Sequence, residues 1–552
     1  MKILHYIILI FFLSAFESLP AQIYIDSTVT YLKGGSNINA KPGDTVYLRA
    51  GHKPYLLLEN IHGKKDSVVV FINYGGTVII NTTHYFGITT KNCTYFRITG
   101  SGDQSIAYGI DIQKVENGSG IGISSLSNHF EIDHIRIANT LLAGIYAKTD
   151  PDTTFRSVRD SFLMEDVFIH HNLLYNIRDE GMYIGSTKYF GQHITYRGKD
   201  TLLFPHLLHN VDISFNKIIN TGWDGIQLSS ASQDAVIHDN MILNDSYRDY
   251  PNQMSGIMVG GGTKADCYNN YISGGHGCGI VLASVGGQRI FNNIIIDAGR
   301  KFYPSDLTQM QHGIYVDDIT VEKDSSFYIF NNLIYQPKSD GIRFRSLLSK
   351  NNKIANNVII KPGNYGYYDT LNTSFNPQDA FIMLTDKNIS VDTFSNQWSM
   401  NCNNLGFTDT LTYDFTLLPS SPLIDAGADL TSYGILFDIY NHARPYGTAY
   451  DIGPFEFNAV YLKTQKNSKK STINIFPNPA STSLIIHSSI PLTNPEISIF
   501  NISGQEVKTD TASVRTISPF SVFVDVESLK NGIYFIRIVN GNMVFVEKFI
   551  VN

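Results

Sequence analysis

The feature that most constrains this sequence is an asparagine followed nine residues later by a glycine. The five pairs at this offset are Asn172/Gly181, Asn216/Gly225, Asn270/Gly279, Asn332/Gly341 and Asn357/Gly366. With insertions allowed, Asn240/Gly256 and Asn293/Gly313 have a longer gap, and Asn139/Gly144 has a shorter one. Uninterrupted copies recur about every 23 to 25 residues. A period in that range predicts a solenoid, in which each repeat packs against its neighbours.

Each repeat reads as three short strands separated by turns. The segment "VDISFN" alternates apolar and polar residues, "KIIN" is a short β-branched run, and "GIQLSS" alternates again. Three such strands form one coil of a right-handed parallel β-helix, so we predict an all-β fold. We expect the repeated asparagine to occupy a tight turn in the left-handed region and to bond the asparagine of the next coil. We expect the repeated glycine to begin the following strand after a second tight turn.

The N-terminus reads as an export signal. Lys2 precedes an apolar run over residues 3–16, and "SLPAQ" offers a cleavage site after Ala21, so residues 1–21 are predicted to be a signal peptide. We expect no transmembrane segment in the mature chain, because no later apolar run is long enough to span a bilayer. The net charge of -7 provides no basic surface for nucleic acid, which excludes that class of partner.

The four cysteines show no zinc-binding spacing; they are Cys93, Cys267, Cys278 and Cys402. Cys267 and Cys278 could form a disulfide within one repeat. The favoured interpretation is that the cysteines are buried and behave as small apolar residues.

The regular array resembles the family of secreted right-handed parallel β-helix proteins, which includes many pectate, alginate and chondroitin lyases and some glycoside hydrolases. The resemblance covers about Ala40 to Asp369, and "AKPGDTVYLRAG" (Ala40 to Gly51) resembles the opening coil common in that family. It implies a solenoid, which we place at residues 22–419, and a polysaccharide as ligand or substrate. The family hosts many chemistries, so the resemblance implies no single activity.

The stretch from Ser420 to Phe457 resembles the S-P-x-I-D-x-G … R-P … D-I-G-x-x-E tail that often closes bacterial β-helix proteins. We predict that residues 420–460 form a cap over the last coil, which would otherwise expose unpaired strand edges. Four acidic residues of this tail could hold a structural calcium ion, although ordinary turn and hydrogen-bond roles are favoured. They are Asp425, Asp438, Asp451 and Glu456.

Residues 461–471, "YLKTQKNSKKS", form a basic, polar linker. Beyond it, the blocks "INIFPNPASTSLIIHSS", "ISIFNISGQEV", "LKNGIYFIRIVNG" and "EKFIVN" resemble the C-terminal sorting domain of type IX secretion substrates. The resemblance implies a small β-sandwich over residues 472–552, which directs the protein through the outer membrane by the type IX secretion machinery. A carbohydrate-binding sandwich is the alternative.

The strand after each repeated glycine should point alternate residues outward on one long face. Adjacent coils lie ~4.8 Å apart, so side chains in one column can touch. The first outward column should hold Tyr146, Tyr183, Gln227, Met258, Val281, Tyr315 and Arg343. The residues just before the glycines form another column of Glu180, Asp224, Ser255, Cys278, His312 and Asp340. Long insertions precede Ser255 and His312, and such insertions commonly wall a binding face.

The first candidate catalytic cluster comes from two neighbouring coils and comprises His312, Tyr315, Asp317, Asp340, Arg343 and Arg345. In a lyase that acts on a uronic acid, Arg343 or Arg345 could neutralise the sugar carboxylate. His312 or Tyr315 could then remove the C5 proton. The alternative is a network of surface salt bridges between the two aspartates and the two arginines.

The second candidate cluster comprises Asp179, Glu180 and Asp224. Glu180 and Asp224 occupy equivalent positions on consecutive coils, a spacing near the ~5 Å of the carboxylates in retaining glycosidases. The same pair could bind calcium, and an aspartate before glycine is also ordinary turn chemistry. The candidate substrate-binding residues are Tyr183, Trp223, Gln227 and Lys338.

These features predict a secreted or surface-located protein that binds a polysaccharide and degrades it, as a lyase or a glycoside hydrolase. Calcium is a candidate cofactor. The alternative is a cell-surface adhesin that binds the glycan without cleaving it.

Overall fold

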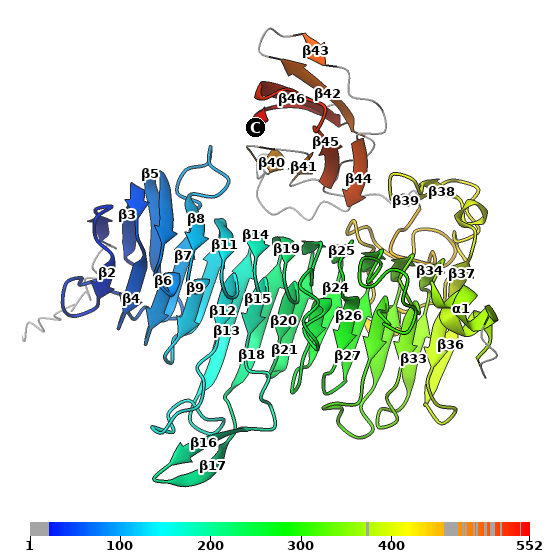
Figure 1. Ribbon diagram of the computed structural model, residues 1–552, viewed down its shortest axis with the longest axis horizontal. Helices are drawn as coiled ribbons and strands as arrows, with labels where there is room; N and C mark the ends of the chain where they lie inside the picture. Colours follow the sequence, from blue (N-terminus) through cyan, green and yellow to red (C-terminus); the bar gives the residue numbers. More distant parts are fainter. Residues whose placement is uncertain are drawn as a thin grey trace, which may run out of the picture.

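The computed structural model describes residues 21–370, 375–457 and, with short gaps, residues 473–551. Nearly all of the predicted signal peptide and the whole predicted linker lie outside these described residues. Most of the described chain winds into a long solenoid of parallel strands (Figure 1). Each regular coil contributes one strand to each of three rows, so the predicted parallel β-helix is confirmed.

Two of the rows join into one 23-stranded parallel sheet. The first row holds β1 (Gln22–Ile25), β3 (Thr45–Lys53), β5 (Val69–Thr82), β7 (Thr94–Thr99), β10 (Asn128–Asp133), β13 (Leu163–His170) and β18 (Leu207–Ser214). It continues with β21 (Ala231–His238), β24 (Ala265–Tyr268), β27 (Gln288–Phe291), β30 (Phe327–Phe330), β33 (Asn352–Ala355) and β36 (Val391–Phe394). The long strands β3 and β5 also reach into the second row, which connects the two.

The second row begins at β8 (Ile110–Val115), β11 (Ile135–Thr140), β14 (Leu173–Ile177), β19 (Lys217–Thr221) and β22 (Met241–Leu243). It ends with β25 (Tyr271–Ser273), β28 (Ile294–Ile296), β31 (Leu333–Tyr335), β34 (Val358–Ile360) and β37 (Gln397–Ser399).

The third row is a separate 12-stranded parallel sheet, which includes the strands at the repeated glycines. Its first half is β2 (Tyr31–Lys33), β4 (Leu56–Glu59), β6 (Phe86–Lys91), β9 (Ser119–Ser124), β12 (Ile145–Ala147) and β15 (Met182–Ile184). Its second half is β20 (Ile226–Leu228), β23 (Ser255–Val259), β26 (Cys278–Leu282), β29 (Ile314–Val316), β32 (Ile342–Phe344) and β35 (Ile382–Leu384). Ile226 and Leu228 are fully buried, as the alternation predicts, because they face the core that all three rows enclose.

The repeated asparagines form a continuous buried ladder through the turns between the first and second rows. Each side-chain amide donates to the carboxamide oxygen of the next asparagine at 2.9–3.1 Å. The ladder runs through Asn172, Asn216, Asn240, Asn270, Asn293, Asn332, Asn357 and Asn396. The predicted bonding between coils is therefore confirmed.

The prediction that these asparagines themselves adopt the left-handed backbone conformation was wrong. The left-handed position is the residue before each ladder asparagine, for example Phe215 (φ 54°) and Asn269 (φ 54°). This turn directs the next side chain inward, where its amide satisfies buried backbone groups. Asn139 belongs to a different column, since it lies in register with Asn176 near the end of the second-row strands β11 and β14.

The repeated glycines are needed for close approach between coils. A Cβ atom on Gly225 would lie 2.6 Å from the carbonyl oxygen of Gly256 and 2.6 Å from Cγ2 of Ile242. The Asn357/Gly366 match is a coincidence of spacing, because Gly366 lies in the helix α1 (Asn364–Thr370). Phe381, just before β35, stands at the glycine position of that coil, since its carbonyl oxygen accepts from the N–H of Ile342.

The insertions leave the solenoid as separate elements. The hairpin β16 (Gln192–Tyr196) and β17 (Lys199–Leu203) projects from one side (Figure 1). The segments 245–254 and 298–311 contain no strands or helices. The segment after β34 carries α1 and the 3-10 helix η1 (Pro377–Ala380).

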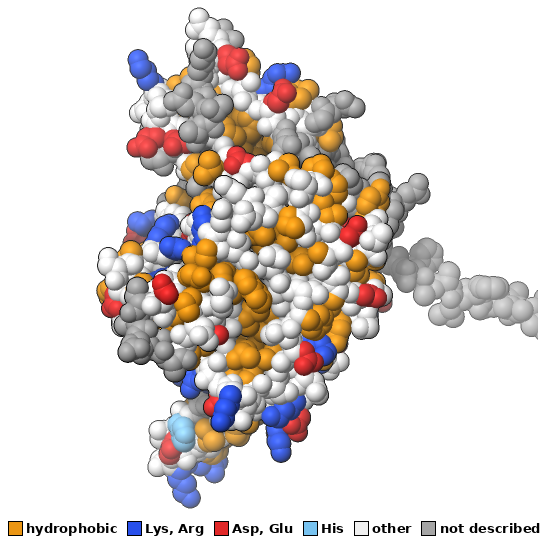
Figure 2. Space-filling model, turned by 90° about the vertical axis from the view of Figure 1, so that its right-hand side faces the viewer, with side chains coloured by type: hydrophobic (Ala, Val, Ile, Leu, Met, Phe, Trp, Pro, Cys, Tyr) orange, Lys and Arg blue, Asp and Glu red, His pale blue; other side chains and the backbone are white. Residues whose placement is uncertain are grey.

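The segment after β37 folds back along the side of the last coils, not over their open end as predicted. It contains η2 (Cys402–Asn404), β38 (Phe407–Asp409), β39 (Asp414–Leu417) and η3 (Thr431–Tyr433). Turn asparagines of three consecutive coils donate to its backbone, as Asn292 does to Phe437, Asn331 to Gly453 and Asn356 to Ala428, each at 2.9 Å. The last coil consequently leaves side chains such as Trp398 and Met400 about two-fifths exposed, and Figure 2 shows hydrophobic surface across this end.

The four acidic residues of this segment have hydrogen-bonding roles. Asp425, Asp438, Asp451 and Glu456 all accept backbone N–H groups. Arg444 forms a buried ion pair with Glu456 at 2.9 Å. The four cysteines are free and buried, as favoured from the sequence. Among the described residues, no helix is long and apolar enough to cross a membrane.

The C-terminal residues form two antiparallel four-stranded sheets. One contains β40 (Ile473–Phe476), β41 (Ser483–Ser488), β45 (Ser521–Asp525) and β44 (Val514–Ser518). The other contains β43 (Glu506–Val507), β42 (Glu496–Asn501), β46 (Gly532–Asn540) and β47 (Met543–Val551). Residues of both sheets, such as Leu484 and Ile536, share one hydrophobic core, so this part is the predicted small β-sandwich.

Candidate functional site

The outward face of the 12-stranded sheet carries the predicted column of side chains. The strand register places Tyr146 beside Tyr183, Tyr183 beside Gln227, and Tyr315 beside Arg343. Met258 and Val281 fill the positions between Gln227 and Tyr315. The column therefore has Tyr146 and Tyr183 at one end and Tyr315 and Arg343 at the other, with uncharged, non-aromatic side chains between them.

The column just before the glycines is buried. Its members are between 0% and 6% exposed: Glu180, Asp224, Ser255, Cys278, His312 and Asp340. Two insertions lie against this column. Tyr250 of the 245–254 insertion stacks on Trp223, the residue before Asp224, with 4.5 Å between ring centroids. Asn364 of α1 contacts Asp340. The insertions thus wall this side of the sheet and restrict access to the column.

Asp340 is the centre of the first cluster. Its Oδ2 accepts from Nη1 of Arg343 at 2.9 Å and lies 3.3 Å from Nδ1 of His312. Its Oδ1 accepts from Nδ2 of Asn364 at 2.7 Å and from the hydroxyl of Tyr368 at 2.9 Å. Burial raises the pKa of Asp340, but the hydrogen bond from His312 and the neighbouring charges outweigh it and hold the pKa below its ordinary value.

Tyr315, Asp317 and Arg345 form the accessible part of the same cluster. The Tyr315 hydroxyl donates to Oδ2 of Asp317 at 3.1 Å, and Nη1 of Arg345 lies 3.5 Å from that hydroxyl. The Arg345 side chain is 61% exposed, and its ion pair with Asp317 is long, at 3.5 Å. Burial raises the pKa of Tyr315 despite the nearby arginine, so the phenol is protonated at neutral pH. Burial lowers the pKa of His312, which favours a neutral imidazole.

Glu180 and Asp224 of the second cluster precede adjacent strands, and both side chains are buried. Burial raises the pKa of Glu180 to about 7 and that of Asp224 well above its ordinary value. Oδ1 of Asp224 accepts from the Ser255 hydroxyl at 2.7 Å, while its Oδ2 is buried without a hydrogen-bond partner. The buried Oε1 of Gln227 and Oγ of Ser229 also lack partners. Burial therefore disfavours the ionised form of both acids, whereas glycoside hydrolysis needs an ionised carboxylate.

The remaining predicted binding residues have different environments. Tyr183 is half-buried on the sheet, and Nζ of Lys148 lies 4.7 Å from its ring centroid. Gln227 is 1% exposed, and one face of Trp223 is covered by Tyr250. Lys338 is buried, and its Nζ donates to carbonyl oxygens of Phe302 and Tyr303. Lys338 therefore anchors the 298–311 insertion.

Sequence reasoning missed Asn364 and Tyr368, which bond Asp340 from α1. No repeat pattern could have identified them, because they lie in an insertion. It also missed Asp245, whose pKa burial raises to about 6 and which lies in the 245–254 insertion.

One group of potential metal ligands converges among the described residues: Glu131, Asp133 and His170 of the first row. Arg97 already forms ion pairs with both carboxylates, at 3.1 Å to Glu131 and 2.7 Å to Asp133. His170 lies 3.1 Å from Glu131. The resident guanidinium balances the charge that a metal would neutralise.

Two known families match this chain, one within the solenoid and one in the C-terminal domain. Residues 208–378 match the right handed beta helix region. Residues 474–552 match the secretion system C-terminal sorting domain. A right-handed β-helix region within the solenoid is thus followed by a C-terminal type IX sorting domain. The sorting domain directs this β-helix protein to the cell surface or the extracellular space.

No curated protein matches the sequence. Among solved structures, the lacto-N-biosidase of Eubacterium ramulus shares 11% identity and a TM-score of 0.44, over 69% of this chain and 68% of that one. Pectate lyase Pel9A shares 14% identity and a TM-score of 0.39, over 79% and 96%. A family 6 polysaccharide lyase from Pseudopedobacter saltans shares 12% identity and a TM-score of 0.30, over 67% and 93%. The likenesses concern the fold and carry no assignment of activity.

Proposed function

We propose that this secreted protein binds an acidic polysaccharide across the outward face of the 12-stranded sheet and cleaves it by β-elimination near Tyr315. The observation that carries the proposal is the Arg345 guanidinium. Its side chain is 61% exposed, its ion pair with Asp317 is 3.5 Å long, and its Nη1 lies 3.5 Å from the Tyr315 hydroxyl. An exposed arginine of this kind can bind a sugar carboxylate in a bidentate manner.

The neighbouring groups support the roles that β-elimination needs. Arg345 neutralises the sugar carboxylate, which makes the C5 proton easier to remove. The neutral imidazole of His312 takes that proton, a C4–C5 double bond forms, and the C4–O bond breaks. The protonated phenol of Tyr315 donates a proton to the departing oxygen. Asp340 positions both His312 and Arg343.

Binding without cleavage is the second candidate function. The 6% exposure of the His312 side chain favours it, because a base must contact the substrate. The complete burial of Asp224 likewise argues against hydrolysis at the second cluster.

The test combines polygalacturonate, alginate and chondroitin sulfate with neutral polysaccharide controls. Unsaturated ends, followed by ultraviolet absorbance, and reducing ends are measured together. We expect unsaturated ends from at least one acidic polymer, reduced about 100-fold or more by Tyr315→Phe or Arg345→Ala. Arg537→Ala, an exposed arginine of the C-terminal β-sandwich, is the control and should retain activity.

The outcomes separate the candidate reactions. Reducing ends without unsaturated ends would refute β-elimination in favour of hydrolysis. Binding of an acidic polymer that is weakened by Arg345→Ala, with no cleavage of any polymer, would establish the non-catalytic function.

A further inference from the structure

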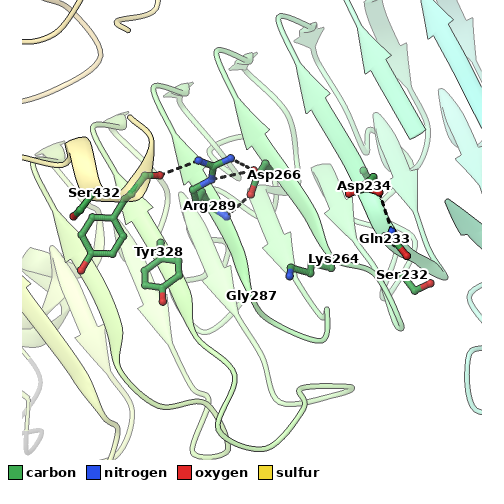
Figure 3. Close-up of a pocket in the computed structure, with 11 residues that line it drawn as sticks. Ser232, Gln233, Asp234, Lys264, Asp266, Gly287, Arg289, Tyr328 and Ser432 are labelled. Atoms are coloured by element: carbon green, nitrogen blue, oxygen red, sulfur yellow. Dashed lines mark hydrogen bonds and ion pairs between the residues drawn. The ribbon is translucent and has the colours of Figure 1, made fainter. Parts of the chain in front are cut away.

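A hollow of about 590 Å³ lies on another face of the solenoid, away from the 12-stranded sheet. It is lined by outward residues of the first row on β21, β24, β27 and β30, and by the turn at η3. Figure 3 shows Asp234, Lys264, Asp266 and Arg289 on neighbouring strands of this hollow, with Ser432 at its far side. Its volume falls within the range of about 300–1,000 Å³ typical of small-ligand pockets.

The hollow has a fixed floor. The backbone N–H of Arg289 donates to Oδ1 of Asp266 at 2.7 Å, and Nε donates to Oδ2 at 3.0 Å. Nη1 of Arg289 donates to the carbonyl oxygen of Tyr433 at 2.8 Å. These contacts join two adjacent coils to the segment that folds back along the solenoid. The floor is therefore preorganised before any ligand binds.

The charges of the hollow balance. Asp234 and Asp266 supply two carboxylates, while Lys264 and Arg289 supply two cations. The Asp234 and Lys264 side chains are exposed. A strongly anionic or cationic ligand would gain little net attraction, whereas a neutral ligand rich in hydroxyl groups could use both donors and acceptors.

The wall of the hollow is aromatic. The rings of Tyr328 and Tyr433 lie 5.3 Å apart with a 49° angle between their planes. Both residues are half-buried at the side of the hollow. Aromatic walls combined with planar polar side chains suit a pyranose ring, which has an apolar C–H face and a rim of hydroxyl groups.

We propose that this hollow is a second, non-catalytic glycan-binding site that takes a neutral sugar unit of a polysaccharide. It is independent of the proposed cleavage near Tyr315. Two sites on different faces would hold the protein on a mixed glycan matrix more tightly than either alone, provided that both can be occupied together.

The test is affinity electrophoresis of the full chain, starting at Gln22, through gels containing galactomannan, xylan or mixed-linkage glucan. We expect retardation by at least one of these neutral polymers. Tyr328→Ala should raise the Kd about tenfold, as expected for loss of one stacking ring. A second variant, which combines Lys264→Ala with Asp234→Gly, tests the same hollow independently in case Tyr328→Ala does not fold. Glycine is suitable there because Asp234 has a φ of 51°.

Lys387→Ala, an exposed lysine elsewhere on the solenoid, is the matched control, and Arg345→Ala tests independence from the sheet face. Both should leave the retardation unchanged. Two results would overturn the proposal: no retardation by any of the neutral polymers, or equal retardation of wild type and both hollow variants. If Arg345→Ala abolished retardation, the neutral glycan would be bound on the 12-stranded sheet instead.

Discussion

Replacing Asn270 with alanine tests whether the asparagine ladder holds the coils together. Oδ1 of Asn270 accepts from the backbone N–H of Asn240 at 3.1 Å and from its Nδ2 at 3.1 Å. Nδ2 of Asn270 donates to the carbonyl oxygen of Ile237 at 2.9 Å and to Oδ1 of Asn293 at 3.0 Å. Asn270 is fully buried, so water cannot easily replace these partners.

The magnitude follows from the groups that lose a partner. Asn240 and Asn293 keep other hydrogen bonds through their side chains. The backbone N–H of Asn240 and the carbonyl oxygen of Ile237 lose the bonds described above. At about 1–3 kcal/mol for each of these two buried groups left unpaired, we expect Asn270→Ala to lower the free energy of unfolding by about 2–6 kcal/mol.

Equilibrium urea unfolding of the chain from Gln22 onward, followed by far-ultraviolet circular dichroism, measures this loss. Asn269→Gly is the control. Its native φ of 54° suits glycine, and its side chain makes only a 3.3 Å bond to Asp239, so we expect a loss of about 1 kcal/mol or less. Equal losses in the two variants would refute the idea that the buried ladder carries the stability of the turn.

Three further predictions concern the coils, the buried acids and export. Gly225→Ala should destabilise the protein by about 2–4 kcal/mol in the same assay, because its Cβ would lie 2.6 Å from the Gly256 carbonyl oxygen. Gly366→Ala, which meets nothing within 4 Å, should not destabilise it. Glu180 has a folded pKa of about 7, raised by burial, so its contribution to stability falls as pH rises from the unfolded pKa of about 4.3 toward 7. Glu180→Gln should therefore raise the melting temperature relative to wild type at pH 8 but not at pH 4, and an equal effect at both values would contradict this. Deleting residues 474–552 should leave the protein inside the cell, as measured by immunoblotting of cells and medium; normal export would contradict a sorting role.

The sequence alone determined the solenoid because its coils repeat the same physical requirement. The coils from Asn172 onward have an inward asparagine at one turn, most of them have no Cβ at the next, and the resulting Asn and Gly spacing is visible without a structure. The same alternation fixed which side chains of the 12-stranded sheet face outward, including Tyr315 and Arg343. The sorting domain was identifiable from sequence because its characteristic blocks occur in order near the C-terminus.

The tertiary structure decided what that local pattern could not specify. An offset of nine residues cannot distinguish Gly225, which is pressed against the next coil, from Gly366, which lies in an inserted helix. The burial of Asp224 depends on how distant segments cover it, so its inaccessibility has no local signature. The hollow beside Arg289 likewise requires the Tyr433 carbonyl, 144 residues away, to reach the same side of the solenoid. Repetition encodes the coil, whereas access to its surfaces depends on where the non-repeating segments pack.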